Sequence, residues 1–252
     1  MDIRWGAKYV FRYNTVHNPW ITTHSGCTNG VAEPIWVEIY KNTFTDDANR
    51  YFQPIWIRSS SGLVWGNTSS APLNVFAIGI DFERAWTSCG GVYGARCDGT
   101  RAWDENAGPY GYKCLGQPGW GQPQAGNMNS ATFQGVFAWG NRNGGTLVNL
   151  GRINDSPYQS DYLVFGRELF NEANMTTGLI ANRPSTCNPG PAGRSIYIST
   201  NENSQGATMY VCTATNVWTK HWEPYSYPHP LTLTGGGSGT PTPNSPTGLI
   251  VQ

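Results

Sequence analysis

Two short groups of charged residues have the composition needed for chemistry on a polysaccharide. Asp46 and Asp47 precede Arg50 closely, and the run from Asp81 through Glu83 to Arg84 is similar. Cleavage of acidic polysaccharides by β-elimination needs a basic residue beside carboxylates that bind Ca²⁺, and hydrolysis needs paired carboxylates that flank the bond. Both groups are therefore candidate catalytic sites.

Each group also has a structural interpretation. Asp46–Asp47 follows Asn42, the end of a predicted strand, and falls where a solvated turn is expected. Alternation along a strand would place Asp81 and Glu83 on one face. Asp104 and Glu105 could bind Ca²⁺ together with loop carbonyls, but their surroundings lack the pattern of a Ca²⁺ loop. The histidines show no metal-ligand spacing, so neither another metal site nor a cofactor is predicted.

Aromatic residues offer a second kind of chemistry, because the chain has 11 Trp and 13 Tyr while only 13% of its residues are charged. Exposed rings stack on the faces of sugars, and they equally pack against another protein chain or lie buried beneath loops. The candidates for ligand binding are Trp65, Trp103, Tyr110, Tyr112, Trp120 and Trp139.

The composition indicates strands and turns. Charged residues make up 13% of the 252 residues, against roughly a quarter in ordinary soluble domains, and there are 31 Gly and 17 Pro. Lys plus Arg equals Asp plus Glu at 16 each, so no net charge attracts nucleic acid or an anionic membrane. No apolar run is long enough to span a bilayer, and membrane insertion is not expected.

A repeated strand that ends in asparagine must position these residues. The segments KYVFRYNTV, WVEIYKNTF and SGLVWGNTS align on Asn14, Asn42 and Asn67, and GVFAWGNRN places Asn141 in the same register. A repeat of between 20 and 30 residues is typical of a solenoid, whereas hairpins of a sandwich usually return every 8 to 12 residues. Ordinary Asn-Thr hairpin turns in a sandwich remain the alternative.

Alternation within the repeat predicts which residues point inward. Three residues before each asparagine stand Phe11, Ile39, Val64 and Ala138. The intervening positions should form an outer wall, with Val10, Glu38, Leu63 and Phe137 followed by Arg12, Tyr40, Trp65 and Trp139. We expect the asparagines to tolerate tight-turn backbone angles and to hydrogen-bond to one another at a spacing of about 4.8 Å.

Other alternating runs fit the same repeat, and helical periodicity is nearly absent. One short helical turn is predicted around residues 167–174. The additional strands are expected at 73–82, 146–154, 161–169, 194–200 and 207–213.

The six cysteines indicate disulfides in an oxidising compartment, because none forms a C-x-x-C pair. We predict that Cys97 bonds Cys114 and that Cys187 bonds Cys212, since each pair flanks a stretch rich in Gly and Pro. Cys27 and Cys89 either bond to each other or stay free. The N-terminal residues lack the apolar segment of a signal peptide, so such a signal would have been removed or would lie on a longer precursor.

The asparagine-terminated repeats, the insertion GARCDGTRAWDENAGPYGYKCLGQPGWG at 94–121 and the closing EPYSYPHPLT at 223–232 resemble the C-terminal half of bacterial secreted right-handed parallel β-helix proteins. The resemblance covers most of residues 7–232. It implies an all-β, right-handed parallel β-helix over 1–232, truncated at its N-terminal end, with long disulfide-pinned loops. Residues 233–252 read as a Gly/Pro-rich linker, and their last residues resemble the first strand of a fibronectin or immunoglobulin-like module.

The fold does not decide the function, because lyases and glycosidases share it with adhesins. The first expectation is a non-catalytic extracellular or cell-surface scaffold that self-associates, joins neighbouring modules of a larger chain or contacts a polysaccharide. The alternative is a polysaccharide lyase or glycoside hydrolase. The apolar tail TGLIVQ is expected to add a strand to a sheet edge, most informatively on a second copy of the chain.

Overall fold

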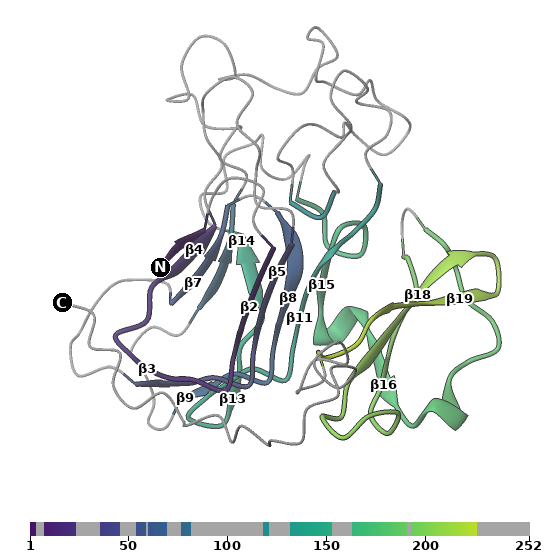
Figure 1. Cartoon of the computed structure of the whole chain (residues 1–252). Helices are drawn as coiled ribbons and strands as arrows, with labels where there is room; N and C mark the ends of the chain where they lie inside the picture. Colours follow the sequence, from purple (N-terminus) through teal and green to yellow (C-terminus); the bar gives the residue numbers. More distant parts are fainter. Residues whose placement is uncertain are drawn as a thin grey trace, which may run out of the picture.

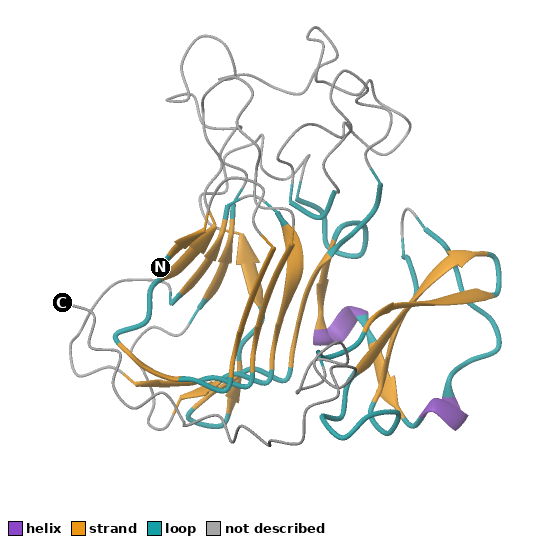
Figure 2. Cartoon of the chain, viewed as in Figure 1, coloured by secondary structure: helices purple, strands orange, loops and turns teal. Residues whose placement is uncertain are grey.

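The structure is a computed structural model that describes residues 1–3, 8–23, 36–45, 54–58, 60–69, 77–81, 118–120, 132–152, 163–190 and 193–225. These residues form an all-β protein with parallel sheets (Figure 2). Two short 3₁₀ helices, η4 (Glu172–Asn174) and η5 (Ile180–Asn182), are the helical segments of the described part. The helical turn predicted around 167–174 is therefore β15 followed by η4.

Three five-stranded sheets make up the N-terminal body. The first sheet contains β1 (Asp2–Ile3), β4 (Ile21–Thr23), β7 (Ile55–Ile57), β10 (Ile78–Ile80) and β14 (Leu150–Arg152). The second contains β2 (Lys8–Arg12), β5 (Trp36–Tyr40), β8 (Ser61–Trp65), β11 (Val136–Trp139) and β15 (Leu169–Asn171). The third contains β3 (Thr15–His17), β6 (Thr43–Thr45), β9 (Thr68–Ser69), β12 (Arg142–Asn143) and β13 (Thr146–Leu147).

The chain visits the first, second and third sheets in turn and then returns to the first (Figure 1). We call each such circuit a pass. Strands of successive passes pair in parallel, so that Val37 of β5 lies opposite Tyr9 of β2 and Gly62 of β8. Within the described sheets of this body, the pairing of β12 with β13 is antiparallel. Parallel neighbours exclude the alternative of hairpin turns for the three repeats.

The inward faces of the three sheets enclose one hydrophobic core. Ile21, Ile55, Ile78 and Leu150 lie in register across the first sheet, and each is at most 4% exposed. The predicted inward residues Ile39, Val64 and Ala138 belong to the same cluster, and Phe11 packs against it while partly buried. Burying one such aliphatic side chain contributes about 1.5–3 kcal/mol, so this stack of strands has a continuous apolar interior.

The predicted asparagine ladder, consisting of Asn14, Asn42, Asn67 and Asn141, is confirmed. The side-chain amide of each asparagine donates to Oδ1 of the next, with N···O distances of 3.1, 2.9 and 2.9 Å. The amide also donates to a carbonyl of the preceding pass, as from Asn42 to Phe11 and from Asn67 to Ile39, at 2.9 Å in both cases. The buried amides are thus satisfied in series.

The tight turn at each asparagine is made by the residue before it. Tyr13, Lys41, Gly66 and Gly140 have φ values of 57°, 55°, 61° and 64°. Left-handed backbone costs a residue with a Cβ roughly 1–2 kcal/mol, and glycine avoids this cost. The expectation that the asparagine itself takes the unusual backbone angles is therefore wrong. Its amide serves the hydrogen bonds, and the preceding residue makes the bend.

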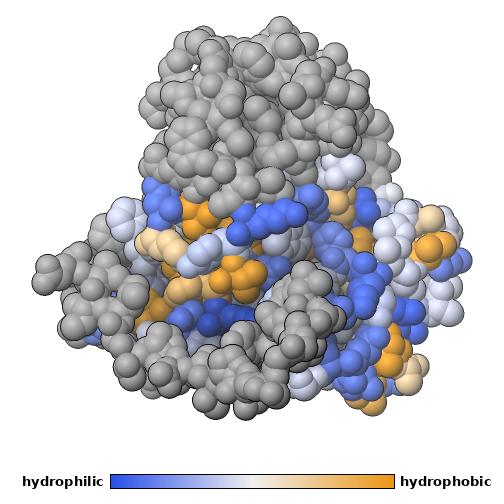
Figure 3. All heavy atoms as spheres, viewed as in Figure 1, coloured by the Kyte–Doolittle hydropathy of each residue, from blue (hydrophilic) through white to orange (hydrophobic). Residues whose placement is uncertain are grey.

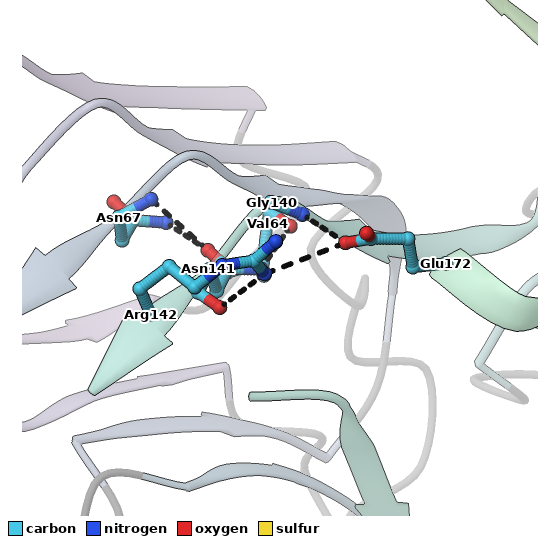
Figure 4. A network of polar contacts seen from close by, with 6 residues as sticks. All are labelled: Val64, Asn67, Gly140, Asn141, Arg142 and Glu172. Carbon is cyan, nitrogen blue, oxygen red and sulfur yellow. Dashed lines mark hydrogen bonds and ion pairs between the residues drawn. The ribbon is translucent and has the colours of Figure 1, made fainter. Parts of the chain in front are cut away.

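A glutamate accepts the backbone hydrogen bond at the last of these turns, next to the end of the asparagine ladder (Figure 4). In earlier passes, the N–H of Lys41 and of Gly66 donates to a carbonyl of the next pass. The N–H of Gly140 instead donates to Oε2 of Glu172 at 2.9 Å, and Arg142 lies 3.6 Å from the same oxygen. Glu172 thus takes the place of the backbone acceptor that another strand would supply.

A fourth sheet follows the stacked passes. This C-terminal sheet contains β16 (Thr176–Gly178), β17 (Ile196–Ser199), β18 (Thr208–Ala214) and β19 (Val217–Trp222). The strands predicted at 194–200 and 207–213 are present, but β17 pairs antiparallel with β18 and β18 antiparallel with β19. They do not continue the passes, so the prediction that they belong to the same repeat is wrong.

The C-terminal sheet packs on the outer face of the second sheet (Figure 1). Tyr40, Trp65 and Trp139 stack with ring centroids 5.4 and 5.5 Å apart, and the ring of Trp222 meets all three edge-on. Phe137 forms a second stack with Phe170 at 5.3 Å. Aromatic pairs of this geometry add about 0.5–1.5 kcal/mol each beyond the area they bury. The part of the predicted outer wall formed by Tyr40, Leu63, Trp65, Phe137 and Trp139 is therefore an internal interface.

The remaining sequence predictions for strands have mixed outcomes. β10 lies within 73–82, β13 and β14 lie within 146–154, and 161–169 contributes the first residue of β15. The insertion at 94–121 is described at 118–120 alone. The linker and tail at 233–252 lie outside the described residues, as does the tail's expected added strand.

Candidate binding pocket

A polar hollow opens beside the C-terminal sheet, between the end of η4, the start of β17 and the strand β19. It encloses about 250 Å³. We call it the Arg194 pocket, and its lining includes Asn174, Thr176, Thr186, Arg194, Ser195 and Trp218. The size is close to the lower end of ligand pockets, which hold about 300–1,000 Å³, so it suits a small molecule or one residue of a polymer.

Arg194 provides the charge of the pocket. Nη1 donates to the carbonyl of Cys212 at 3.3 Å, and the guanidinium carbon lies 3.9 Å from the centre of the Phe133 ring. Nε is buried and has no hydrogen-bond partner among the described residues. Burial lowers the pKa of the Arg194 guanidinium from its ordinary value, because removing water disfavours the charged form.

The absence of a side chain at Gly190 allows the backbone to lie close to Arg194. Gly190 has a φ of +90°, and a Cβ there would lie 3.2 Å from both Cβ and Nε of Arg194. A side chain at this position would be strained by the backbone angle and would also crowd the guanidinium. The Phe133 ring and Gly190 together restrict where the guanidinium can lie.

Trp218 forms a wall of the pocket from β19. Its indole N–H donates to the carbonyl of Pro184 at 2.7 Å. The ring also meets that of Tyr197 edge-on at 6.2 Å and lies 6.0 Å from the guanidinium carbon of Arg183, so a ligand can contact the part of the ring that lines the pocket. Pro184 belongs to the segment that the Cys187–Cys212 disulfide ties to β18, with a Cα–Cα distance of 5.8 Å. This confirms the prediction for that pair of cysteines. Cys27, Cys89, Cys97 and Cys114 lie outside the described residues.

The uncharged side chains that line the pocket can form hydrogen bonds with the hydroxyl groups of a ligand. The side chains of Asn174, Thr176 and Thr186 are exposed, and none makes a hydrogen bond within the described structure. Ser195 Oγ accepts from the backbone N–H of Asn188 at 3.0 Å and retains its own proton as a donor. The pocket therefore combines one cation, one aromatic wall and several free amide or hydroxyl groups.

A second hollow lies at the hairpin of β12 and β13. It encloses about 460 Å³ and is lined by Asn143, Thr146, Leu147 and Asn149 with backbone of Gly144. Its described lining has neither a charged nor an aromatic side chain, so it offers less chemistry than the Arg194 pocket.

The candidate catalytic groups of the sequence are not brought to either pocket within the described residues. Asp81 follows β10 and has no exposed surface, and its backbone N–H donates to the carbonyl of Ile57 at 2.9 Å. The other candidates, Asp46, Asp47, Arg50, Glu83 and Arg84, lie outside the described residues, as do Asp104 and Glu105 of the possible Ca²⁺ site. In the described part of the chain, no group of His, Cys, Asp and Glu is arranged to hold a metal ion.

The aromatic candidates fare differently from what their alternation predicts. Trp65 is 5% exposed and Trp139 is 6% exposed, because the C-terminal sheet covers them. They lie on the outer face of the second sheet, as predicted, but this covering leaves them poorly placed to stack on a sugar. Trp120 is half-buried, and its ring meets that of Phe133 edge-on at 6.2 Å. Trp103, Tyr110 and Tyr112 lie outside the described residues.

Two ionisable side chains lie in the interface between the sheets. His221 packs against Trp36 and Phe137 and contacts the carbonyl of Gln134 through Nε2 at 2.9 Å. Burial lowers the pKa of His221, so that the neutral ring donates this hydrogen bond. Glu38 accepts from the indole N–H of Trp36 at 2.9 Å, and burial raises the pKa of its carboxyl. Both groups are used in packing.

An apolar edge is visible elsewhere on the surface. β2 is the edge strand of the second sheet, and Val10 on it is 44% exposed. Tyr13 and Trp20, from the same end of the stack, are 57% and 51% exposed. Figure 3 shows apolar patches among polar residues on the face seen in that view. Across the described residues, no helix is long and apolar enough to cross a membrane.

Comparison with known proteins found no match: no protein-family model fits the chain, and no curated protein and no solved structure shows significant similarity to it. The function must therefore be inferred from the geometry of the molecule itself.

Proposed function

We propose that this chain is a non-catalytic extracellular or cell-surface scaffold that folds as a right-handed parallel β-helix and contacts glycans. The passes through three parallel sheets and the asparagine ladder support the β-helix, in which each pass is one coil. The right hand follows from the general rule that parallel crossover connections are right-handed in about 98% of cases.

The compartment is inferred from the cysteines. The Cys187–Cys212 disulfide supports an oxidising setting such as the outside of a bacterial cell, since disulfides are rare in reducing cytosol. The equal numbers of acidic and basic residues, 16 each, give no support to nucleic acid as a partner. The proposed partners are instead a polysaccharide, neighbouring modules of a larger chain and a second copy of this chain.

A scaffold is favoured over an enzyme by the roles of the described carboxylates. Glu168 is fully buried and pairs with Arg167, Glu172 accepts a hydrogen bond from the backbone N–H of Gly140, and Glu38 accepts a hydrogen bond from Trp36. Each therefore has a structural use. A polysaccharide lyase or hydrolase remains the alternative, and its candidate residues other than the buried Asp81 lie outside the described part.

The observation that carries the glycan contact is the Arg194 pocket. An indole ring, exposed hydroxyls and an amide with no partner in the described structure match the apolar face and the hydroxyl edge of a sugar ring. A rigid stack of strands would hold such a pocket in a defined position at little entropic cost on binding.

The proposal can be tested by sedimenting the purified full chain with insoluble polysaccharides and, in parallel, incubating it with soluble ones. We expect the wild-type chain to co-sediment with at least one polysaccharide and Trp218→Ala to co-sediment less. We also expect no new reducing ends and no unsaturated sugars. Release of either product would establish the enzyme alternative. No binding to any polysaccharide would contradict the glycan contact.

Self-association is a separate part of the proposal, supported by the exposed apolar residues at the β2 edge. An edge strand presents unpaired backbone groups that can pair with another chain. Light scattering of the full chain should give a mass above that of the monomer, and Val10→Lys should lower it because a charge at an edge opposes pairing. A monomer for the wild type would contradict self-association.

A further inference from the structure

We propose that the Arg194 pocket binds a sugar that carries a carboxylate group. This inference rests on the proposed glycan contact, and it adds the charge and the part of the ligand that the pocket recognises. It concerns the C-terminal sheet and the segment tied to it, so the stacked passes serve as its support.

The first step of the argument is the uncompensated charge of Arg194. Two arginines in the described structure pair with a carboxylate, since Arg167 pairs with Glu168 and Arg142 lies 3.6 Å from Glu172. Arg12 and Arg183 instead lie over aromatic rings. Arg194 has no carboxylate partner among the described residues, and its one hydrogen bond goes to a backbone carbonyl. A partly buried cation is costly without an anion, so an arriving carboxylate would gain both charge pairing and hydrogen bonds.

The second step is the geometry of the cation. The guanidinium lies against the Phe133 ring on one side and against Gly190 on another, with little freedom to turn. Since Nε is buried, the N–H groups of Nη1 and Nη2 at the end of the planar guanidinium are the parallel donors that would match the two oxygens of a carboxylate. A tetrahedral sulfate ester can also accept two hydrogen bonds from such a fork, so the sulfated probe below tests the choice of a carboxylate.

The third step is the remainder of the ligand. A carboxylate alone would leave Trp218 and the side chains of Asn174, Thr176 and Thr186 without a contact. A pyranose ring offers an apolar face to the indole and hydroxyl groups to the amide and hydroxyls. The space of about 250 Å³ accommodates one such ring, so the ligand is one residue of a polysaccharide rather than a long segment of it.

The decisive experiment titrates the full chain by calorimetry with three probes of equal length: an oligomer of glucuronic acid, its methyl ester, and an oligosaccharide that carries sulfate esters but no carboxylate. We expect the acid to bind at least about tenfold more tightly than the ester, the ratio that one charge-assisted hydrogen bond supplies. Arg194→Gln should weaken binding of the acid about tenfold and leave the affinity for the ester unchanged.

Two more variants keep the test interpretable. Arg194→Lys retains the charge without the fork and should restore part of the affinity for the acid. Lys220→Gln removes an exposed charge on the same strand as Trp218, outside the pocket, and should bind like the wild type. Near-ultraviolet circular dichroism should show that Arg194→Gln keeps the packing of the aromatic interface.

Every other outcome contradicts one named part of the inference. Equal affinity for acid and ester would refute the carboxylate while leaving glycan contact standing. Preference for the acid that survives Arg194→Gln in a folded variant would place the site elsewhere. Sulfated and carboxylated sugars binding alike would refute the selectivity for a carboxylate. Failure of all three probes to bind would contradict the inference, and co-sedimentation with neutral polysaccharides would then decide whether the glycan contact also fails.

Discussion

Asn67 and Asn141 are joined through their side chains although 74 residues separate them: Nδ2 of Asn67 donates to Oδ1 of Asn141 at 2.9 Å. The backbone N–H of Asn67 donates to the same oxygen at 3.1 Å. The chain therefore leaves the second sheet after β8 and re-enters it at β11 in the register of the earlier passes. This contact therefore joins the turn after β8 to the turn after β11, across the long segment that separates them in sequence.

Three glycines should separate the cost of backbone angle from the cost of crowding. Gly62 has a φ of +149°, and a Cβ there would lie 2.0 Å from the carbonyl oxygen of Val37. Gly140 has a φ of +64°, and its nearest neighbour would be 3.6 Å away. Gly151 of β14 has neither restriction. Alanine should cost more than about 3 kcal/mol at Gly62, about 1 at Gly140 and less than about 0.5 at Gly151.

Denaturant unfolding of the three alanine variants measures these differences. A Gly62→Ala variant as stable as Gly151→Ala would show that β5 and β8 do not approach as closely as described.

The fold was predictable where the same type of residue recurs at a regular spacing along the chain. Asn14, Asn42 and Asn67 recur with alternating apolar residues on the same side, and both features follow from local spacing. Parallel pairing was predictable for the same reason. The role of Lys41 and Gly66 was missed, because Tyr, Lys and Gly share no chemical type that marks a left-handed backbone in advance.

What covers the outer wall was not predictable. Trp65 and Trp139 alternate with core residues, but nothing near them in the chain reveals that Trp222 will meet their rings. A local signal for the covering hairpin does exist, because Asn216 has a φ of 61° in the short turn between β18 and β19. Asparagine tolerates that conformation, so the sequence Ala-Thr-Asn-Val could have indicated a hairpin.

The pocket was missed for a related reason. Arg194 precedes β17 and Trp218 lies on β19, and the antiparallel pairing of β17 and β19 with β18 brings them together. Neither residue has a neighbour in sequence that indicates binding. The disulfide between Cys187 and Cys212 was the nearest available signal, since it places the segment around Pro184 against β18.

Trp222 should be the residue that holds the C-terminal sheet to the second sheet. Its ring contacts Tyr40, Trp65 and Trp139, so Trp222→Ala should cost about 3–5 kcal/mol and should diminish the near-ultraviolet dichroism of the stacked rings. Val217 on the same strand is 50% exposed, and Val217→Ala should cost less than about 0.5 kcal/mol. Similar losses for both variants would mean that the stack is not covered by β19.

His221 should make stability depend on pH. Its pKa is lowered in the folded protein, whereas an unfolded histidine titrates near about 6.5. Between these two values the unfolded chain binds more protons, so stability should fall as the pH drops below about 6.5 and should be level above it.

His221→Gln, which keeps a donor for the carbonyl of Gln134, should flatten this fall by up to about 1.4 kcal/mol per pH unit. Urea unfolding midpoints at a series of pH values provide the measurement. An unchanged slope in the variant would assign the pH dependence to other groups.

The Cys187–Cys212 disulfide should contribute to both stability and the pocket. The cysteines are 25 residues apart, and a loop of this length restricts the unfolded chain by about 3 kcal/mol. Replacing both cysteines with alanine should lower the free energy of unfolding by about that amount and should weaken glycan binding, because Pro184 and Thr186 lose their attachment to β18. Peptide mass mapping of the unreduced wild type should recover the linked pair. Two free thiols there would contradict the assignment.

The most direct test of the stacked passes is a double-mutant cycle on Asn67 and Asn141, measured by denaturant unfolding of the two single alanine variants and the double variant. Each single variant should lose about 1–3 kcal/mol of unfolding free energy. Because both variants break the same hydrogen bond of 2.9 Å, the sum of the two single losses should exceed the loss in the double variant by at least about 1 kcal/mol. Asn14 and Asn141, which do not contact each other, should give additive losses in the same cycle. Additivity within about 0.5 kcal/mol for Asn67 and Asn141 would contradict the ladder and, with it, the register in which the passes stack.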